Sequence, residues 1–352
     1  MADKTGGNNM MESIMYFPCL RAINHKIVFV LLLLLIACVP SGEKETIPDV
    51  VTLLHITDTH VSDLEGYHPA IVDRRQQYGD GYLPLNEFFR SLPGEVPATA
   101  VIITGDIIDF YEGETVNSTM RNGQVEFFAK LHGRSPIPLL MTLGNHDIST
   151  YLSGVDEGTQ STLYDYNADI ARASFIRTIA CFSEGTYYSR QYRAGQTEYR
   201  LIFLDNALRV PRVLNGYFGL QQLHWLEYQL LDAENETVVL FYHIPIPVAD
   251  TNQDSIHFRI PPAGWLDDEV VKDGFMNLLN TYPAIVAAFT GHGHRNIIED
   301  MLLPAGHSFT QIETAAFGNN PSNWRVIQLR ENEIVISAPG SENHEKRITI
   351  VQ

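Results

Sequence analysis

The sequence predicts an α/β domain in which two mixed β-sheets pack face to face between outer helices, a four-layer αββα sandwich. Apolar, β-branched runs alternate with helical stretches through most of the chain, as they do where crossover helices connect parallel strands. Near the C-terminus the helical stretches stop and short strand-like runs follow one another, which indicates antiparallel strands. Together these patterns favour two packed sheets with helices on the outside.

The first 37 residues are expected to be a secretory signal and no part of the fold. Basic residues precede an apolar run at 27–36, which is too short to span a bilayer comfortably. This run leads into Leu35-Ile36-Ala37-Cys38, which resembles a bacterial lipobox. We therefore expect cleavage before Cys38, a lipid on this cysteine, and an extracytoplasmic domain anchored to the membrane of the bacterial cell envelope. An uncleaved signal anchor is the alternative, and it also places the domain outside the cytoplasm.

The remainder of the chain is interpreted as a tether, residues 38–49, followed by one domain, residues 50–352. The tether is polar and contains prolines, and no second linker or internal repeat follows it. Hydrophobic residues make up 45% of the chain, enough for a sizeable core, and Cys181 is expected to be a buried residue without chemistry. The formal net charge of −18 argues against a nucleic-acid partner, because an acidic surface repels phosphate. The oligomeric state is left open.

The expected elements follow from hydrophobic periodicity. Strands are predicted at 50–56, 100–104, 137–143, 199–204, 237–241 and 284–290, and a C-terminal meander at 296–302, 308–314, 324–329 and 333–338. Helices are predicted at 83–92, 124–131, 168–178, 220–232 and 269–280. Longer irregular stretches are expected at 62–82, 149–167, 246–268 and 317–323, and loops of that length are usually functional.

Five short polar motifs each follow one of the predicted strands directly. They are Asp58-Thr59-His60, Gly105-Asp106-Ile107-Ile108-Asp109, Gly144-Asn145-His146-Asp147, Tyr242-His243 and Gly291-His292-Gly293-His294. Metal ligands have this distribution when neighbouring strands deliver them to one edge of a sheet. Taken singly, most of these motifs are weak signals, because Gly-Asp turns and histidines at strand ends are common in ordinary proteins.

The first two motifs supply carboxylates and a histidine suited to a metal ion. Asp58 and His60 are two positions apart, so in an extended chain they point the same way and can hold one ion. Asp106 can use both carboxylate oxygens and thereby bridge two cations. Asp109, three residues further on, is a candidate hydrogen-bond acceptor for a ligand histidine.

The remaining motifs add an amide and several imidazoles. Asn145 can contribute its amide oxygen to a shared site, and His146 can act as a proton donor that Asp147 orients and keeps protonated. The two histidines of Gly291-His292-Gly293-His294 stand between glycines, where they have little packing purpose, so metal binding is favoured there.

In this order the motifs resemble those of the calcineurin-like metallophosphoesterase superfamily, over residues 50–295. The resemblance implies the four-layer metallophosphoesterase fold and two metal ions. It assigns one ion to Asp58, His60, Asp106 and His294, and the other to Asp106, Asn145, His243 and His292. It makes His146 the residue that contacts the phosphate and assists the leaving group, with Asp147 or Asp109 behind it. Manganese, iron and zinc all suit oxygen and imidazole ligands without a thiolate.

The resemblance also implies the reaction, hydrolysis of a small phosphate-ester substrate by a hydroxide that bridges the two metals. We favour phosphodiesters, such as glycerophosphodiesters or cyclic nucleotides. The alternatives are a phosphomonoesterase of the same fold and a non-catalytic metal-binding surface module. Purple acid phosphatases carry a tyrosine ligand where this chain has Asp109, so no tyrosinate-iron colour is expected. Candidate substrate contacts are Arg74, Arg75, Tyr164, Tyr166, and His257 and Arg259 in the loop 250–262.

Overall fold

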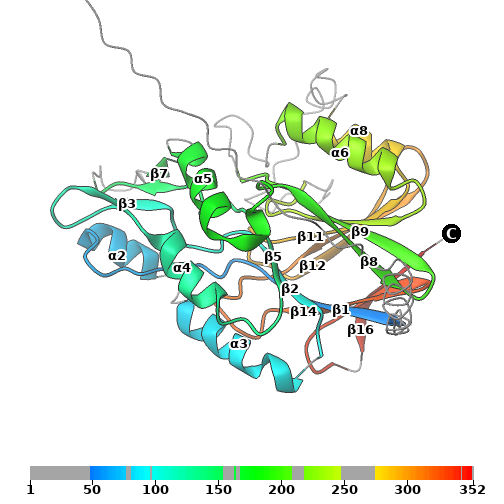
Figure 1. Ribbon diagram of the computed structural model, residues 1–352, viewed down its shortest axis with the longest axis horizontal. Coiled ribbons are helices and arrows are strands. Elements are labelled where there is room, and N and C mark those ends of the chain that lie inside the picture. Colours follow the sequence, from blue (N-terminus) through cyan, green and yellow to red (C-terminus); the bar gives the residue numbers. More distant parts are fainter. Residues whose placement is uncertain are drawn as a thin grey trace, which may run out of the picture. The chain divides into compact units, whose positions relative to one another are not determined.

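Three strands of the first sheet run parallel, and the last three strands of the chain extend it. In the computed structural model its order is β16-β15-β14-β1-β2-β5 (Figure 1). Strands β1, β2 and β5 are parallel, whereas β14 is antiparallel to β1 and continues into β15 and β16 as a meander. The bounds are β1 Val50–Ile56, β2 Ala100–Thr104, β5 Leu139–Thr142, β14 Arg325–Arg330, β15 Glu333–Ser337 and β16 His344–Thr349.

The second sheet has a parallel centre and antiparallel edges. Its order is β12-β13-β11-β10-β9-β8, in which β9, β10, β11 and β13 are parallel and the edge strands β8 and β12 are antiparallel. The bounds are β8 Tyr188–Ala194, β9 Thr197–Phe203, β10 Thr237–Phe241, β11 Ile285–Thr290, β12 Ile297–Leu302 and β13 Ser308–Glu313.

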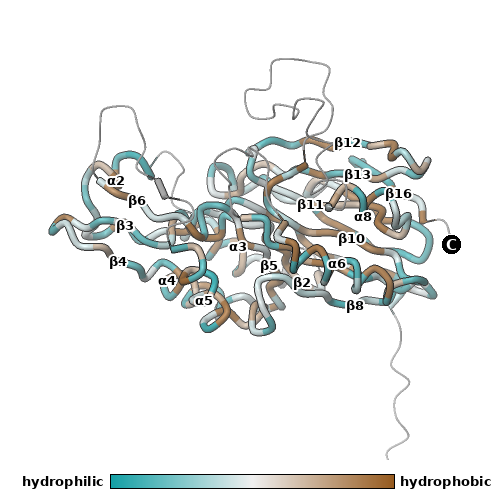
Figure 2. The backbone as a smooth tube through the Cα atoms, turned by 90° about the horizontal axis from the view of Figure 1, so that it is seen from above, coloured by the Kyte–Doolittle hydropathy of each residue, from teal (hydrophilic) through white to brown (hydrophobic). Residues whose placement is uncertain are grey.

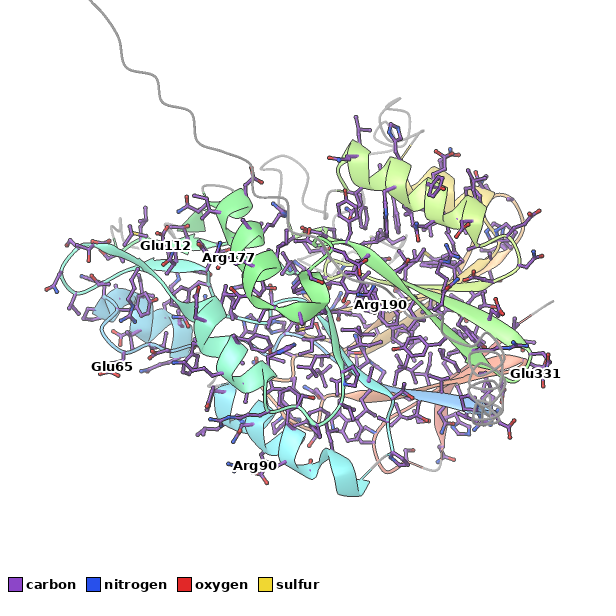
Figure 3. The ribbon with its side chains drawn as sticks, in the orientation of Figure 1. Glu65, Arg90, Glu112, Arg177, Arg190 and Glu331 are labelled. Atoms are coloured by element: carbon purple, nitrogen blue, oxygen red, sulfur yellow. The ribbon has the colours of Figure 1, made fainter. Side chains whose placement is uncertain are left out.

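Helices cover the outer faces of both sheets. Apolar residues of α3 (Tyr82–Glu95), α4 (Gln124–His132) and α5 (Ala168–Thr178) belong to one buried cluster with β1, β2 and β5. Those of α6 (Leu220–Asp232) and α8 (Phe275–Thr281) pack on β9, β10 and β11. Figure 2 shows the hydrophobic residues gathered on the central strands such as β10, and Figure 3 shows charged side chains such as Arg90 and Glu331 at the periphery. The four-layer α/β prediction is confirmed.

Aromatic side chains fill the space between the two sheets. Tyr188, Phe203, Phe241 and Phe289 stand in register on adjacent strands β8, β9, β10 and β11. Their rings stack with centroid distances of 4.7, 4.9 and 5.4 Å. The row ends at His55 of β1, whose ring meets Phe289 edge-on at 5.3 Å. Stacked pairs of this kind add to the burial energy and stabilise the pairing of strands within the second sheet.

Two expectations about the elements are wrong. The C-terminal strands do not form one meander: β12 and β13 join the second sheet, and only β14, β15 and β16 form a meander, in the first sheet. The stretches 62–82 and 149–167 are not simply irregular. They contain the helix α2 (Pro69–Arg75) and the strands β6 (Thr150–Tyr151) and β7 (Thr162–Leu163), which are too short to show a hydrophobic period.

Strands β6 and β7 belong to a small third sheet that the sequence did not predict. Its order is β4-β3-β6-β7, with β3 at Glu112–Glu114 and β4 at Met120–Asn122. Beside it, Tyr67 and Ile71 pack with Phe110 and Tyr151 in a buried apolar cluster. A short 3₁₀ helix, η2 (Ala180–Phe182), precedes β8 and contains the buried, free Cys181.

The structure describes residues 48–76, 81–95, 97–153, 162–163, 167–207, 218–246, 274–341 and 343–350, all within the compact unit Ile47–Gln352. The expected signal, most of the tether, the start of the helix expected at 269–280 and the loop 250–262 lie outside these residues. Within the described part of the chain, no helix combines the length and apolar character needed to cross a membrane.

Candidate metal centre

Four predicted ligands lie where the parallel strands of the first sheet end. Asp58 and His60 follow β1, Asp106 follows β2, and Asn145 follows β5. The loops after β1 and β2 run side by side, since the backbone amide of His60 donates a hydrogen bond to the carbonyl of Asp106 at 2.9 Å. Adjacent parallel strands therefore bring residues from distant parts of the chain to one sheet edge.

The second sheet delivers the other three ligands to the same edge. His243 follows β10, and His292 and His294 follow β11. The amide of Gly291 donates to the carbonyl of His243 at 3.0 Å. The two sheets meet here directly, because the amide of His292 donates to Oδ2 of Asp58 at 3.0 Å.

The backbone is strained at these residues. Six described residues other than glycine have positive φ angles, and five of them are predicted metal ligands: Asp58, His60, Asp106, His292 and His294. Such a conformation costs about 1–3 kcal/mol per residue and persists only where the surrounding contacts enforce it. Its concentration on the ligand set is independent support for a functional site.

The glycines of the motifs make room for ligands that come from other motifs. A Cβ atom added to Gly144 would lie 2.2 Å from both the backbone nitrogen and Oδ1 of Asp106. One added to Gly291 would lie 2.4 Å from Oδ2 of Asp58 and 1.9 Å from Oγ1 of Thr57. Glycine is thus required at both positions for close approach of the ligand loops.

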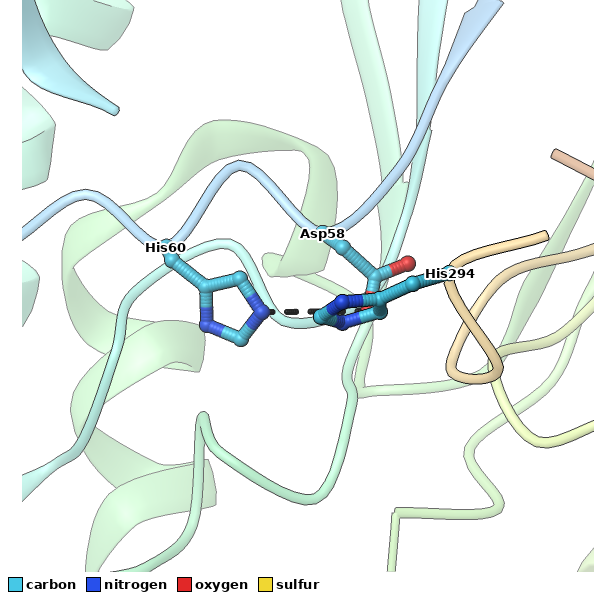
Figure 4. Close-up of side chains that lie close together, drawn as sticks. All are labelled: Asp58, His60 and His294. Atoms are coloured by element: carbon cyan, nitrogen blue, oxygen red, sulfur yellow. Dashed lines mark ion pairs between the residues drawn. The ribbon is translucent and has the colours of Figure 1, made fainter. Parts of the chain in front are cut away.

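The first cluster of ligand atoms contains Asp58, His60 and His294 (Figure 4). Nε2 of His294 lies 3.2 Å from Oδ1 of Asp58, and Nε2 of His60 lies 3.9 Å from the same oxygen. Nε2 of His60 also lies 4.0 Å from Oδ2 of Asp106. Asp58 and His60 are fully buried, whereas the side chain of His294 is 27% exposed, so the cluster opens toward the loop after β11.

The second cluster contains Asp106, His243 and His292. Nε2 of His243 lies 3.1 Å from Oδ2 of Asp106, and the rings of His243 and His292 are 5.1 Å apart. Asn145 is the neighbour of His146, whose backbone amide donates to Oδ1 of Asp106 at 2.8 Å. Oδ2 of Asp106 also lies 4.0 Å from Nε2 of His60 in the first cluster, so this carboxylate stands between His60 and His243.

Buried donor atoms at this site fit metal ions. Among the described residues, Oδ1 of Asn145 is buried without a hydrogen-bond partner. Oδ1 of Asp58 and Nε2 of His243 are buried within 3.2 Å of other ligand atoms, yet lack hydrogen-bond geometry. Leaving buried polar atoms unpaired costs about 1–3 kcal/mol each, and a cation satisfies several of them at once. The oxygen and imidazole donors suit manganese, iron or zinc.

Both aspartates of the clusters are ionised. Burial alone raises the pKa of Asp58, but the contact with His294 and the charge of His243 outweigh it and bring the pKa to about 2. The pKa of Asp106 is likewise well below its usual range, because His243 and His146 outweigh the effect of burial. Deprotonated carboxylates are the form that binds metals.

Hydrogen bonds fix which nitrogen of each ligand histidine faces the clusters. Nδ1 of His60 lies 3.0 Å from Oδ1 of Asp109, and Nδ1 of His243 lies 2.8 Å from the carbonyl oxygen of Thr104. Both partners are acceptors, so each Nδ1 carries a proton and Nε2 is the nitrogen that remains for a metal ion. Asp109 thus has the position expected for an acceptor behind a ligand histidine.

His146 sits at the edge of both clusters and is 9% exposed. Its Nδ1 donates to the carbonyl oxygen of Asp109 at 2.9 Å, and its Nε2 lies 4.0 Å from Oδ2 of Asp106. Burial lowers the pKa of His146 to about 4, so the isolated imidazole is neutral at pH 7.

Asp147 does not have the position expected for it. Its Oδ1 accepts a hydrogen bond from the amide of Ile108 at 2.9 Å, and its Oδ2 accepts one from the amide of Gly144 at 2.7 Å. The carboxyl group therefore ties two loops together and does not orient the His146 imidazole. Burial, followed by the charge of Asp106, raises its pKa well above the usual value.

Sequence reasoning missed two polar residues that support the ligands. Oγ1 of Thr57 donates to Oδ2 of Asp58 at 2.7 Å. Oδ1 of Asn206 accepts from the amides of His243 and Ile244, both at 3.1 Å. Asn206 follows β9 in the same way that the motifs follow their strands, and this placement was the available signal.

One candidate for substrate contact is corrected by the structure. Arg75 is only 2% exposed and forms an ion pair with Asp109, so it does not lie on the surface. Arg74 is half-buried, with its guanidinium 5.8 Å from the ring centre of Tyr151. The other candidates, Tyr164, Tyr166, His257 and Arg259, lie outside the described residues.

Comparison with known proteins identifies the family. The family model for calcineurin-like phosphoesterases matches residues 51–296. Glycerophosphodiester phosphodiesterase GpdQ of Enterobacter lignolyticus (strain SCF1) is 23% identical over 245 residues, which cover 69% of this chain and 70% of GpdQ. The crystal structure of a dimetal phosphatase from Danio rerio shares the fold with a TM-score of 0.52 and 16% identity, covering 86% of this chain and 100% of that one.

The family match spans all five motifs and both clusters of ligand atoms. The residues that it covers include each strand that ends at the site, and the relatives include a phosphodiesterase and a dimetal phosphatase. This chain belongs to the calcineurin-like phosphoesterase family and is a metal-dependent hydrolase of phosphate esters.

Proposed function

We propose that this enzyme hydrolyses phosphodiesters at two metal ions held by the clusters around Asp106. The observation that carries the proposal is the position of this carboxylate between them. One cluster supplies Asp58, His60 and His294, and the other supplies His243 and His292, with Asn145 assigned to the second ion. When bound, the two cations supply an activated water and neutralise the charge of the phosphate.

The protein's own residues position and protonate the substrate. His146 has its Nδ1 fixed by the carbonyl of Asp109, which leaves Nε2 directed toward Asp106 and the clusters. Burial disfavours the imidazolium, whereas an anionic phosphate beside Nε2 favours a proton on that atom. His146 then contacts the phosphate and delivers the proton to the departing alkoxide.

His146 lies where it can give a proton to an alkoxide leaving group, but diesters and monoesters both release one. The diester preference therefore rests on the comparison with known proteins. The curated relative at 23% identity is a glycerophosphodiester phosphodiesterase, which supports glycerophosphodiesters as the substrate class of this chain. A phosphomonoesterase of the same fold and a non-catalytic metal-binding module are the competing functions.

Two chromogenic substrates separate these functions. With Mn²⁺ present, bis-p-nitrophenyl phosphate should be hydrolysed with a higher kcat/KM than p-nitrophenyl phosphate. The reverse order would favour the monoesterase, and bound metal without turnover of either substrate would favour the binding module. Asp106→Asn should abolish most of the activity on both substrates, whereas His146→Asn should abolish most of the activity on a glycerophosphodiester, whose alkoxide needs a proton. Full activity of either variant on these substrates contradicts the assigned roles.

The donor set of carboxylate, amide and imidazole groups suits manganese, iron and zinc alike. We propose manganese or iron at one site, on the family resemblance alone. Dialysis against a chelator should remove the activity, and addition of Mn²⁺, Fe²⁺ or Zn²⁺ one at a time should rank the metals. Full activity with zinc alone would contradict the preference for manganese or iron.

We also propose that the enzyme is lipid-anchored on the extracytoplasmic side of a bacterial membrane. The support is the sequence Leu35-Ile36-Ala37-Cys38 after a short apolar run. Cells grown with labelled palmitate should incorporate the label into the wild type but not into a Cys38→Ser variant. Cys181→Ser is the matched control, since Cys181 is buried and burial raises its thiol pKa to about 12. Label retained in Cys38→Ser would refute the anchor.

A further inference from the structure

A buried guanidinium lies directly behind the metal centre. Arg75 is the last residue of α2 and is only 2% exposed. Its Nε donates to Oδ2 of Asp109 at 2.6 Å and its Nη2 to Oδ1 at 2.5 Å, which is the two-pronged geometry that binds a carboxylate most firmly. Helix α2 therefore contributes to the centre a positive charge that the strand ends do not supply.

Asp109 connects this guanidinium to two histidines of the centre. The same Oδ1 that receives Nη2 of Arg75 lies 3.0 Å from Nδ1 of His60. The carbonyl of Asp109 accepts from Nδ1 of His146 at 2.9 Å, and Nη2 of Arg75 lies 3.3 Å from that nitrogen. The ion pair between Arg75 and Asp109 thus holds Nδ1 of the ligand His60 and Nδ1 of the proton donor His146.

The small third sheet contributes a tyrosine to the same contact. The hydroxyl of Tyr151, in β6, accepts a hydrogen bond from Nη1 of Arg75 at 3.1 Å. The guanidinium lies 4.8 Å from the centre of the Tyr151 ring, and this ring stacks on His146 with an interplanar angle of 25°. The Arg75 guanidinium is therefore held by Asp109 through Nε and Nη2 and by Tyr151 through Nη1.

We propose that Arg75 is a positioning residue for the reaction, holding Asp109 so that His60 and His146 present Nε2 to the metals and the substrate. The inference rests on the proposed function for the part that concerns His146. His60, Asp109 and His146 also lie close enough to hold a metal ion together. The guanidinium occupies both oxygens of Asp109 and brings a positive charge there, which assigns this trio to orientation and not to a third ion.

The physical reason is the cost of a buried charge. A buried carboxylate that loses its cationic partner is destabilised by several kcal/mol, so without Arg75 the Asp109 side chain must move or take up a proton. Either change weakens the hydrogen bond between Asp109 and Nδ1 of His60. It also displaces the Asp109 carbonyl that accepts from Nδ1 of His146. Loss of such an outer hydrogen-bond partner typically lowers metal affinity or activity by about 10–100-fold.

The test compares Arg75→Gln with the wild type in two independent measurements. Titration calorimetry with Mn²⁺ should show an affinity that is lower by about 10–100-fold. At saturating Mn²⁺, kcat should fall by about 100-fold for a glycerophosphodiester, whose alkoxide needs a proton, but by less than about 10-fold for bis-p-nitrophenyl phosphate. KM should change little for either substrate, because Arg75 does not touch the substrate.

Arg200→Gln is the matched control. Arg200 is 4% exposed and forms the same forked contact with Glu236, at 2.9 and 2.6 Å, away from the centre. It should lose stability without a change in Mn²⁺ affinity or in the ratio of the two substrates. Tyr151→Phe keeps the ring and removes only the hydroxyl that holds Arg75, so it should shift both readouts in the same direction by a smaller factor. If Arg75→Gln does not fold, Tyr151→Phe alone tests the positioning role of Arg75.

Unchanged Mn²⁺ affinity together with equal kcat losses for both substrates would overturn the inference. If the wild type hydrolyses no phosphate ester, the proposed function fails, yet the Mn²⁺ titration still tests the effect of Arg75 on His60. In a His146→Ala background, Arg75→Gln should no longer change the ratio of the two substrates. A ratio that still changes there would show that Arg75 does not act through His146.

Discussion

Replacing Gly144 with alanine should damage the metal centre more than the fold. The backbone of Gly144 is not in the left-handed region, so alanine can adopt its conformation. The added Cβ atom, however, would lie 2.2 Å from the backbone nitrogen and Oδ1 of Asp106, whereas real Cβ contacts essentially never fall below 3.0 Å. One of the atoms it would meet, the Asp106 nitrogen, belongs to the backbone, so the loops after β2 and β5 must separate.

The size of the effect follows from this displacement. Overpacking of a closed site costs about 1–3 kcal/mol of stability. The movement needed approaches 1 Å, and a misplacement of that size can lower a catalytic rate by about 100-fold. Because Asp106 lies between the clusters and Asn145 is adjacent to Gly144, Mn²⁺ affinity should fall together with kcat.

The assay combines urea unfolding, Mn²⁺ titration and turnover of bis-p-nitrophenyl phosphate. Gly133→Ala is the control, since Gly133 ends α4 in a right-handed conformation and its added Cβ would meet only the carbonyl of Ala129 at 3.7 Å. The control should keep wild-type stability, affinity and rate. Wild-type Mn²⁺ affinity and kcat in Gly144→Ala would refute the view that close packing of this glycine on Asp106 sets the spacing of the ligands.

Two further changes test the supports of the site. Asn206→Ala removes the acceptor of the His243 and Ile244 amides, which costs about 1–3 kcal/mol for each buried group left unpaired; urea unfolding should show the loss, and unchanged Mn²⁺ affinity would contradict a role in placing His243. His55 is buried and its pKa is lowered from 6.5 to about 3, so between these values the unfolded chain binds more protons than the folded one. Stability should therefore fall as the pH drops below 6.5, by up to about 1.4 kcal/mol per pH unit, and His55→Gln should flatten this slope. An equally steep slope in the variant would show that His55 does not cause this dependence of stability on pH.

Long apolar strands could be read from the sequence almost without error. Strands β1, β2 and β10 have the predicted bounds, because each is a continuous apolar run that a polar motif ends. The strands of the small third sheet were missed, since β6 and β7 have two residues each. Runs of that length have no measurable period, and only the pairing of β6 with β3 and of β7 with β6 makes them strands.

The assignment of the C-terminal strands to sheets was beyond the sequence. Strands β12 to β15 were all predicted as strands and β16 was not, and nothing local distinguishes those of the first sheet from those of the second. The choice is made by pairing partners far away in the chain, with β13 beside β11 and β14 beside β1. Hydrophobic alternation predicts that a segment is a strand, but it does not predict which strand it pairs with.

The burial and the partners of charged residues are even harder to predict from local sequence. Arg75 was predicted as a candidate substrate contact, because burial of a guanidinium depends on a carboxylate that local sequence does not reveal. Its partner Asp109 is 34 positions away. Asp147 looked like the partner of its neighbour His146, but the fold directs its carboxylate to the amides of Ile108 and Gly144.

The sequence by itself determined which side chains could bind metals and that each would stand at the end of a strand, because these properties depend on residue type and local pattern. Only the tertiary structure decided how they meet. His60 faces Asp109 across 49 positions, and the amide of His292 reaches Asp58 across 234. Contacts at such separations arise from strand pairing and from the packing of two sheets, which are properties of the whole folded chain.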